Sequence, residues 1–92
     1  MINETEKKIG KNLKKLREKC SFTQEYVATK LQLGGCDVTR SSVAKIEVGQ
    51  RHIYPDEIIV LKNIFNCSYD DIFDMSQQQK YKLKIADDIY IL

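Results

Sequence analysis

Residues 23–49 read TQEYVATKLQLGGCDVTRSSVAKIEVG, and this stretch contains two short helical patterns separated by a break with two glycines. Each pattern has its own start signal, because Thr23 precedes the first and Thr39 precedes the second. A threonine hydroxyl in that position accepts a hydrogen bond from a free backbone N–H of the first helical turn. The stretch therefore predicts two short helices that pack through apolar faces. The residues of these faces are Val27, Ala28 and Leu31 in the first helix, and Val43, Ala44 and Ile46 in the second.

The outer face of the second helix is more polar than packing against the rest of the domain would require. Its side chains are Arg40, Ser41, Ser42 and Lys45. Two short helices joined by a turn are typical of a helix-turn-helix, in which the second helix enters the major groove of DNA. Arg40 comes directly after the cap, and a guanidinium matches the O6 and N7 acceptors of guanine. We therefore predict that these four side chains contact DNA bases.

Length and composition limit the possible functions. The chain has 92 residues, of which 42% are hydrophobic, so it buries one core and is expected to form a single domain. No nucleophile with a base, carboxylate pair or phosphate-binding glycine loop is present, which argues against an enzyme. The cysteines Cys20, Cys36 and Cys67 include no CxxC pair, and His52 is the single histidine. We therefore expect no zinc site, no disulfide framework, no cofactor and no small-molecule ligand.

Charge is unevenly distributed along the chain. Residues 1–52 carry eleven Lys and Arg against six Asp and Glu, whereas residues 53–92 carry four against seven. This division suits a protein that binds a polyanion with one face and a partner subunit with the other. No apolar run approaches the ~18 residues of a membrane span, and no signal peptide follows Met1. A cytoplasmic location is therefore expected.

Three segments of the chain carry a resemblance to a known family. They are LKKLREKCSFTQEYVATKL (13–31), SSVAKIEVGQR (41–51) and NCSYDDIF (66–73). In this order they resemble the lambda-repressor-like, Cro-type helix-turn-helix regulators of bacteria and phages, also called the xenobiotic-response-element family. The resemblance covers residues 9–73 and implies an all-α domain of five helices that binds double-stranded DNA.

The sequence departs from the family in the turn of the motif. Residues 32–38 make this turn seven residues long, several more than the family's usual turn of roughly 3–4 residues. Either the first helix of the motif continues to Leu33, or a loop bulges there.

The resemblance also implies roles for residues around the motif. Arg17 and Glu47 match an arginine and a glutamate that pair in the family, and this pair would orient the recognition helix, which is the second helix of the motif. The alternative is two independent surface charges. Gln24 matches a glutamine that bonds the DNA backbone, and the loop after Gly49 follows that backbone in the family. The predicted phosphate contacts are Gln24, Thr39, Gln50, Arg51 and His52, with a neutral, solvent-exposed ring as the alternative for His52.

Three further helices are predicted around the motif, at residues 4–20 after an Asn3 cap, at about 55–66, and after Ser68, which forms a capping box with Asp71. Lys7, Lys11 and Lys14 lie on the outer side of the first helix, where solvated lysines are common. The predicted buried residues are Ile9, Leu13, Leu16, Cys20, Ile58, Leu61, Ile64, Phe65, Ile72 and Phe73.

Residues 1–75 form the predicted DNA-binding domain, and residues 76–92 form a carboxy-terminal extension. The runs KYKLKI and IYIL in this extension suit a β-hairpin, or the same residues extend the last helix. An isolated hairpin is marginal in water, and residues 89–92 are too apolar to be exposed. A second copy of the chain is the simplest cover, and the alternative is a monomer whose tail folds back on its own core.

Together these patterns predict a sequence-specific transcriptional regulator, acting as a repressor, that binds a short palindromic operator as a homodimer. The alternative is an antitoxin or another protein-interaction regulator built on the same fold. Arg40 and Lys45 on the recognition helix favour nucleic acid over a protein partner.

Overall fold

The computed structural model describes residues 2–76, and all regular structure in this range is helical. The helices are α1 (Glu4–Lys19), α2 (Gln24–Leu33), α3 (Arg40–Glu47), α4 (Pro55–Phe65) and α5 (Tyr69–Ile72). The predicted five-helix, all-α fold is confirmed. Within residues 2–76, no helix has the length and apolar character needed to span a membrane. The predicted hairpin or helix extension at residues 81–92 lies outside the described residues.

The predicted helix starts are confirmed by their hydrogen bonds. The side chains of Asn3, Thr23 and Thr39 each accept a hydrogen bond from the backbone N–H three residues ahead. Ser68 and Asp71 form the expected reciprocal pair, in which each side chain accepts the other residue's backbone N–H. Each cap satisfies a backbone N–H that the first turn of the helix leaves free. Local sequence therefore sets where four of the five helices begin.

Of the two alternatives for the long turn, the longer helix is confirmed, because α2 continues to Leu33. The helix then ends with a left-handed glycine, Gly35, at φ 91°. The N–H of Gly35 donates to the carbonyl of Gln32, and the N–H of Cys36 donates to the carbonyl of Leu31. This pair of bonds is a Schellman motif, which satisfies carbonyls at the end of the helix and favours glycine in the left-handed position.

The residues after this cap enter the core instead of bulging into solvent. Cys36 and Val38 are both buried, at 4% and 0% exposure. The Gln32 amide donates to the Val38 carbonyl at 2.9 Å and so closes the turn. Burial raises the pKa of the Cys36 thiol, which keeps it protonated and suits a core residue. The extra turn residues therefore anchor α3 to α2.

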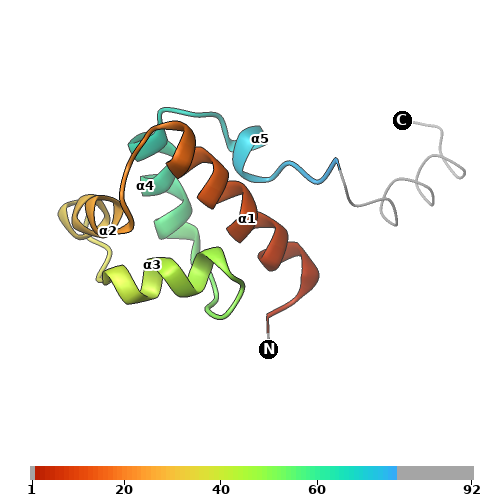
Figure 1. Ribbon diagram of the computed structural model, residues 1–92, viewed down its shortest axis with the longest axis horizontal. Coiled ribbons are helices and arrows are strands. Elements are labelled where there is room, and N and C mark those ends of the chain that lie inside the picture. Colours follow the sequence, from red (N-terminus) through yellow and green to blue (C-terminus); the bar gives the residue numbers. More distant parts are fainter. Residues whose placement is uncertain (1, 77–92) are drawn as a thin grey trace, which may run out of the picture.

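One hydrophobic core lies between the helices. Figure 1 shows α3 packed on both α1 and α2, with α4 against α2 and the short α5 against α1. Burying these apolar side chains is the main force that holds the helices together. The buried residues are Ile9, Leu13, Val27, Ala28, Leu31, Cys36, Val38, Val43, Ile46, Leu61, Phe65 and Ile72.

The structure corrects two predicted core residues. Phe73 is 43% exposed, whereas its neighbour Ile72 is fully buried. Since α5 is a single turn, it directs one of these consecutive side chains inward and the other outward. Ala44 is only partly buried, because it lies one position beyond Val43 toward the outer face of α3. Leu16, Cys20, Ile58, Ile64 and Cys67 pack against the core and are partly buried.

A buried amide fixes α5 to α1. Asn12 is 6% exposed, and its Nδ2 donates to the carbonyls of Ile72 at 2.8 Å and Asp74 at 3.0 Å. Ile72 is the last residue of α5, and Asp74 lies two positions beyond it, so the amide satisfies one carbonyl at the end of the helix and one just after it. The sequence analysis did not assign this residue, because a polar residue inside a charged helix ordinarily faces solvent.

Candidate nucleic-acid interface

The outer face of α3 is open to solvent. Arg40, Ser41 and Lys45 are exposed, so the structure places three of the four predicted base-contacting side chains on an accessible surface. Ser42 is half-buried, and its hydroxyl lies 3.2 Å from the hydroxyl of Thr39. The hydroxyl of Ser42 is thus engaged with the N-cap residue. The side chains most available to a ligand are those of Arg40, Lys45 and Ser41.

Sequence reasoning missed one residue of this face. Val48, the C-cap of α3, is 61% exposed. It follows Arg40 by eight residues and Ala44 by four, a spacing that places the three residues on one side of a helix. That spacing is visible in the sequence and could have identified the residue. The face formed by the exposed residues Arg40, Ser41, Lys45 and Val48, together with the partly buried Ala44, is called the recognition face below.

Arg17 and Glu47 meet in a bidentate ion pair. The Nε of Arg17 lies 2.6 Å from Oε2 of Glu47, and its Nη2 lies 3.1 Å from Oε1. The two side chains are 12% and 4% exposed, so the pair is almost fully buried. The hydrogen bond to the glutamate raises the pKa of Arg17, which keeps the guanidinium charged. The pair joins α1 to the last residue of α3.

Gln24 is the third member of this cluster. Its Nε2 donates to Oε1 of Glu47 at 3.0 Å, so the carboxylate accepts N–H bonds from both α1 and α2. A carboxamide carries two N–H donors and an acceptor oxygen, which leaves Gln24 with bonding capacity beyond this contact. The side chain is half-buried, at the first position of α2. Glu47 thus connects α3 to both flanking helices.

The loop after α3 begins with a second Schellman motif. Gly49 has φ 76°, its N–H donates to the Ile46 carbonyl, and the N–H of Gln50 donates to the Lys45 carbonyl at 2.7 Å. A glycine suits this position because it adopts a positive φ without steric cost. Gln50 itself is exposed. The loop therefore leaves α3 along a defined path.

Arg51 has a partner within the chain that the sequence analysis did not predict. Its guanidinium forms two 2.9 Å bonds to the carboxylate of Glu57, and its Nη1 also donates to the carbonyl of His52 at 2.9 Å. Glu57 is buried, and it accepts the backbone N–H of Tyr54 at the start of α4. These contacts use three of the five guanidinium donors, so two remain for an external acceptor.

His52 joins the same loop to α1. Its Nδ1 lies 2.9–3.0 Å from the carboxylate oxygens of Glu6, and this hydrogen bond is the main cause that lowers the pKa of Glu6. The ring is exposed, which agrees with that part of the alternative prediction for His52, but it has a specific partner in Glu6. The loop is therefore tied to α4 through Arg51 and to α1 through His52.

This fold and this exposed helix define a helix-turn-helix protein. Residues 13–72 match the model of the Cro/C1-type helix-turn-helix family, and the chain belongs to that family. Among solved structures, the chain is similar to the restriction-modification controller protein C.AhdI from Aeromonas hydrophila, with 30% sequence identity and a TM-score of 0.62. The match covers 73% of this chain and 94% of that one. No curated protein sequence matches significantly.

Family membership establishes the class of function. The chain is a DNA-binding transcriptional regulator and not an enzyme. The second helix of the motif is α3, and its residues Arg40, Ser41 and Lys45 are exposed.

Proposed function

We propose that this regulator represses transcription by binding a short palindromic operator as a homodimer, with one α3 in the major groove of each half-site. The observation that carries the proposal is the buried Glu47, which Arg17 and Gln24 hold from two different helices. A rigidly held α3 presents its side chains in one geometry, and base recognition by short side chains requires such a geometry. The similar protein C.AhdI is a restriction-modification controller protein, which supports a regulatory role.

The proposed base contacts are Arg40, Ser41, Ser42 and Lys45. Arg40 is the first residue of α3 and lies at the end that enters the groove, so it is assigned to guanine. The recognition face has no carboxylate of its own, because Glu47 is buried. This makes the face complementary to the acceptor-rich edge of the groove and to the phosphates beside it.

The proposed phosphate contacts are Gln24, Thr39, Gln50, Arg51 and His52. Gln24 lies at the start of α2, where free N–H groups and the helix dipole favour an anion. Arg51 keeps two free donors while Glu57 holds its guanidinium in place. We place the protein in the cytoplasm, where it has access to its DNA.

The first prediction concerns salt. If several residues bind phosphates, the logarithm of the DNA association constant falls linearly with log salt, by about 0.9 per phosphate neutralised. Fluorescence anisotropy between roughly 0.05 and 0.3 M salt measures this slope. A slope near zero would exclude the nucleic-acid function.

The second prediction separates base reading from phosphate binding. Arg40→Ala is expected to cost about 1–3 kcal/mol on the best site and to relax preference at one symmetric pair of positions. Gln50→Ala is the control, because loss of a phosphate contact weakens all sequences alike. Sequencing of DNA bound by each variant measures both effects. An unchanged preferred site in the Arg40 variant would move the reading role to Lys45 or Ser42.

Homodimer formation is assigned to the carboxy-terminal half of the chain. The acidic carboxy-terminal half and the apolar tail at residues 89–92 favour a second copy of the chain as partner. Tyr69, the first residue of α5, and Phe73, its C-cap, are each 43% exposed and offer additional apolar surface. A two-fold symmetric dimer would explain a palindromic site.

The third prediction tests the tail as dimer interface. A chain that ends after Gln77 is expected to keep its helical circular dichroism, to sediment as a monomer, and to lose affinity for a full palindrome. Its affinity for an isolated half-site should persist, because α3 is unaffected. If the shortened chain sediments as a dimer, the interface lies elsewhere, and Phe73→Ser on α5 is the next variant.

A further inference from the structure

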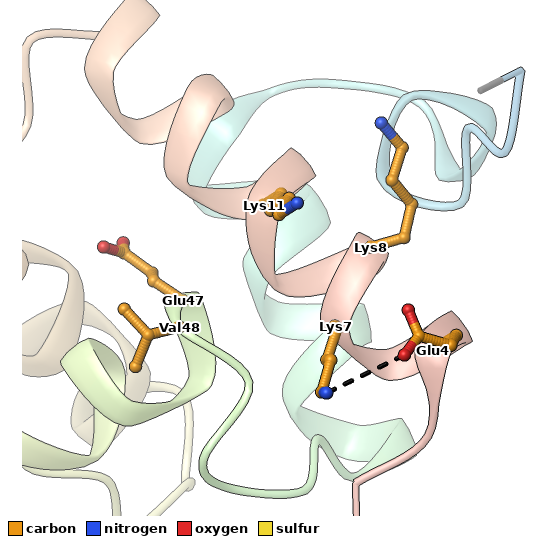
Figure 2. Close-up of a pocket in the computed structure, with 6 residues that line it drawn as sticks. All are labelled: Glu4, Lys7, Lys8, Lys11, Glu47 and Val48. Atoms are coloured by element: carbon orange, nitrogen blue, oxygen red, sulfur yellow. Dashed lines mark ion pairs between the residues drawn. The ribbon is translucent and has the colours of Figure 1, made fainter. Parts of the chain in front are cut away.

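A hollow lined by lysines lies beside the end of the recognition helix, between α1 and α3 (Figure 2). Its volume is about 130 Å³. We propose that Lys7 and Lys11 hold a phosphate of the DNA backbone in this hollow, at the edge of the major groove that α3 enters. This inference rests on the proposed function and extends the interface to α1. The lining residues are Glu4, Lys7, Lys8, Lys11, Glu47 and Val48.

Two glycines bring α1 against the end of α3. A Cβ added at Gly10 would overlap the carbonyl oxygen of Ile46, and one added at Gly49 would lie 2.7 Å from Cγ of Lys7. Because neither glycine has a Cβ, the backbones approach closely and the aliphatic part of Lys7 packs on Gly49. This packing holds the start of the lysine side chain beside α3 and restricts where its ammonium group can lie. An immobilised stem lowers the entropic cost of holding an anion.

The carboxylates around the hollow do not neutralise it. Glu47 directs its carboxylate away from the lysines in Figure 2 and accepts bonds from Arg17 and Gln24. Glu4 lies 3.8 Å from Lys7, but both side chains are about half exposed or more, so the pair is weak and readily exchanged for a phosphate. The hollow therefore keeps a positive balance.

Not every lysine of α1 faces this way. In Figure 2 the side chain of Lys8 extends away from Lys7, toward α5. Lys8 and Lys15 also line a different hollow, together with Asp71 and Asp74, and both lysines contribute to the lowered pKa of Asp74. One side of α1 thus faces acidic residues of its own chain, whereas Lys7 and Lys11 lie beside the recognition helix.

The dimensions of DNA suit this placement. Val48 follows Arg40 by eight residues, or about 12 Å along the axis of α3 at 1.5 Å per residue. The major groove is about 12 Å wide. If Arg40 reaches base edges, the other end of α3 comes to the sugar-phosphate backbone that borders the groove. The hollow opens beside Val48, and its volume equals that of about four waters at ~30 Å³ each, which leaves room for an anionic oxygen group.

The test compares two double variants of the full chain. Lys7→Gln with Lys11→Gln is expected to reduce the salt slope by about 0.9 and to weaken binding roughly five- to tenfold near 0.1 M salt, equally for the best site and for other sequences. Lys15→Gln with Lys19→Gln is the matched control, because it removes two charges from the same helix at exposed residues that do not line the hollow. Its slope should stay close to that of the wild type. Lys7→Arg with Lys11→Arg should retain the slope.

Phosphate ethylation interference supplies a readout that does not depend on overall charge. The wild type should be blocked by ethylation of one phosphate that the Lys7/Lys11 glutamine variant ignores, and thermal unfolding shows whether that variant is folded. Equal slopes for wild type and variant, an equal loss in the control, or no such phosphate in the wild-type pattern would each overturn the inference. Salt-independent wild-type binding would instead overturn the proposed function itself.

Discussion

Glu47→Ala is expected to lower the free energy of unfolding by about 3–5 kcal/mol, because it leaves the guanidinium of Arg17 buried without its carboxylate. The pair is almost fully buried, so solvent cannot replace the lost partner. DNA affinity should fall as well, since α3 loses its connection to both α1 and α2. Urea denaturation measures the first effect and anisotropy titration the second.

The double variant distinguishes a coupled pair from two independent charges. If Arg17 and Glu47 stabilise one another, Arg17→Ala with Glu47→Ala costs clearly less than the sum of the two single variants. Glu25→Ala is the control, because Glu25 is an exposed residue for which about ±0.5 kcal/mol is expected. Additive costs for Arg17 and Glu47 would show that the ion pair contributes little coupling energy.

Gly10→Ala is expected to destabilise the protein by about 1–3 kcal/mol, although the same change inside a helix is ordinarily favourable by about 1 kcal/mol. The added Cβ would overlap the backbone carbonyl of Ile46, and backbone cannot move aside as the end of a flexible side chain can. α1 and α3 must therefore separate. The recognition helix then shifts, and DNA affinity should fall together with stability.

Lys14→Ala provides the control for helix propensity, because Lys14 is exposed on the same helix and has no such neighbour in the core. Thermal unfolding of the two variants measures the difference. A Gly10 variant that is as stable as the wild type, or more so, would show that the two helices separate at little cost.

The helix starts could be predicted from the sequence because caps are local. Thr23, Thr39 and Ser68 satisfy backbone groups three residues away, so the signal and its consequence lie within one turn. The end of α2 is harder to predict. A left-handed glycine commonly ends a helix, and here two glycines, Gly34 and Gly35, are adjacent in the sequence. The bonds of the Schellman motif select Gly35.

The parts that could not be predicted depend on residues far apart in the chain. Asn12 and its two carbonyl acceptors are separated by about sixty positions, and the partner of His52 lies 46 positions before it. Arg51 and Glu57 are an exception, because they lie only six positions apart and meet through the path of the loop that leads into α4. The close approach at Gly10 again depends on distant residues, because the carbonyl oxygen that Gly10 meets belongs to Ile46 in α3. Pairing of this kind arises only when the helices pack.

The candidate site also contains features that the sequence predicts and features that it does not. The exposed positions of α3 follow from helical spacing, so Arg40, Ser41 and Lys45 could be assigned to the surface from the sequence. The same spacing could have assigned Val48 to the surface. The half-buried Ser42, by contrast, has a hydroxyl contact with the Thr39 cap that spacing alone does not show.

Selection of bound sequences from a random DNA pool tests the central claim most directly. With the purified full chain, the proposed function predicts enrichment of one inverted repeat, with half-sites about 34 Å apart or a multiple of that distance, and guanine at a symmetric pair of positions within it. A pool that stays random after repeated rounds, although the protein is folded, would contradict sequence-specific recognition by α3.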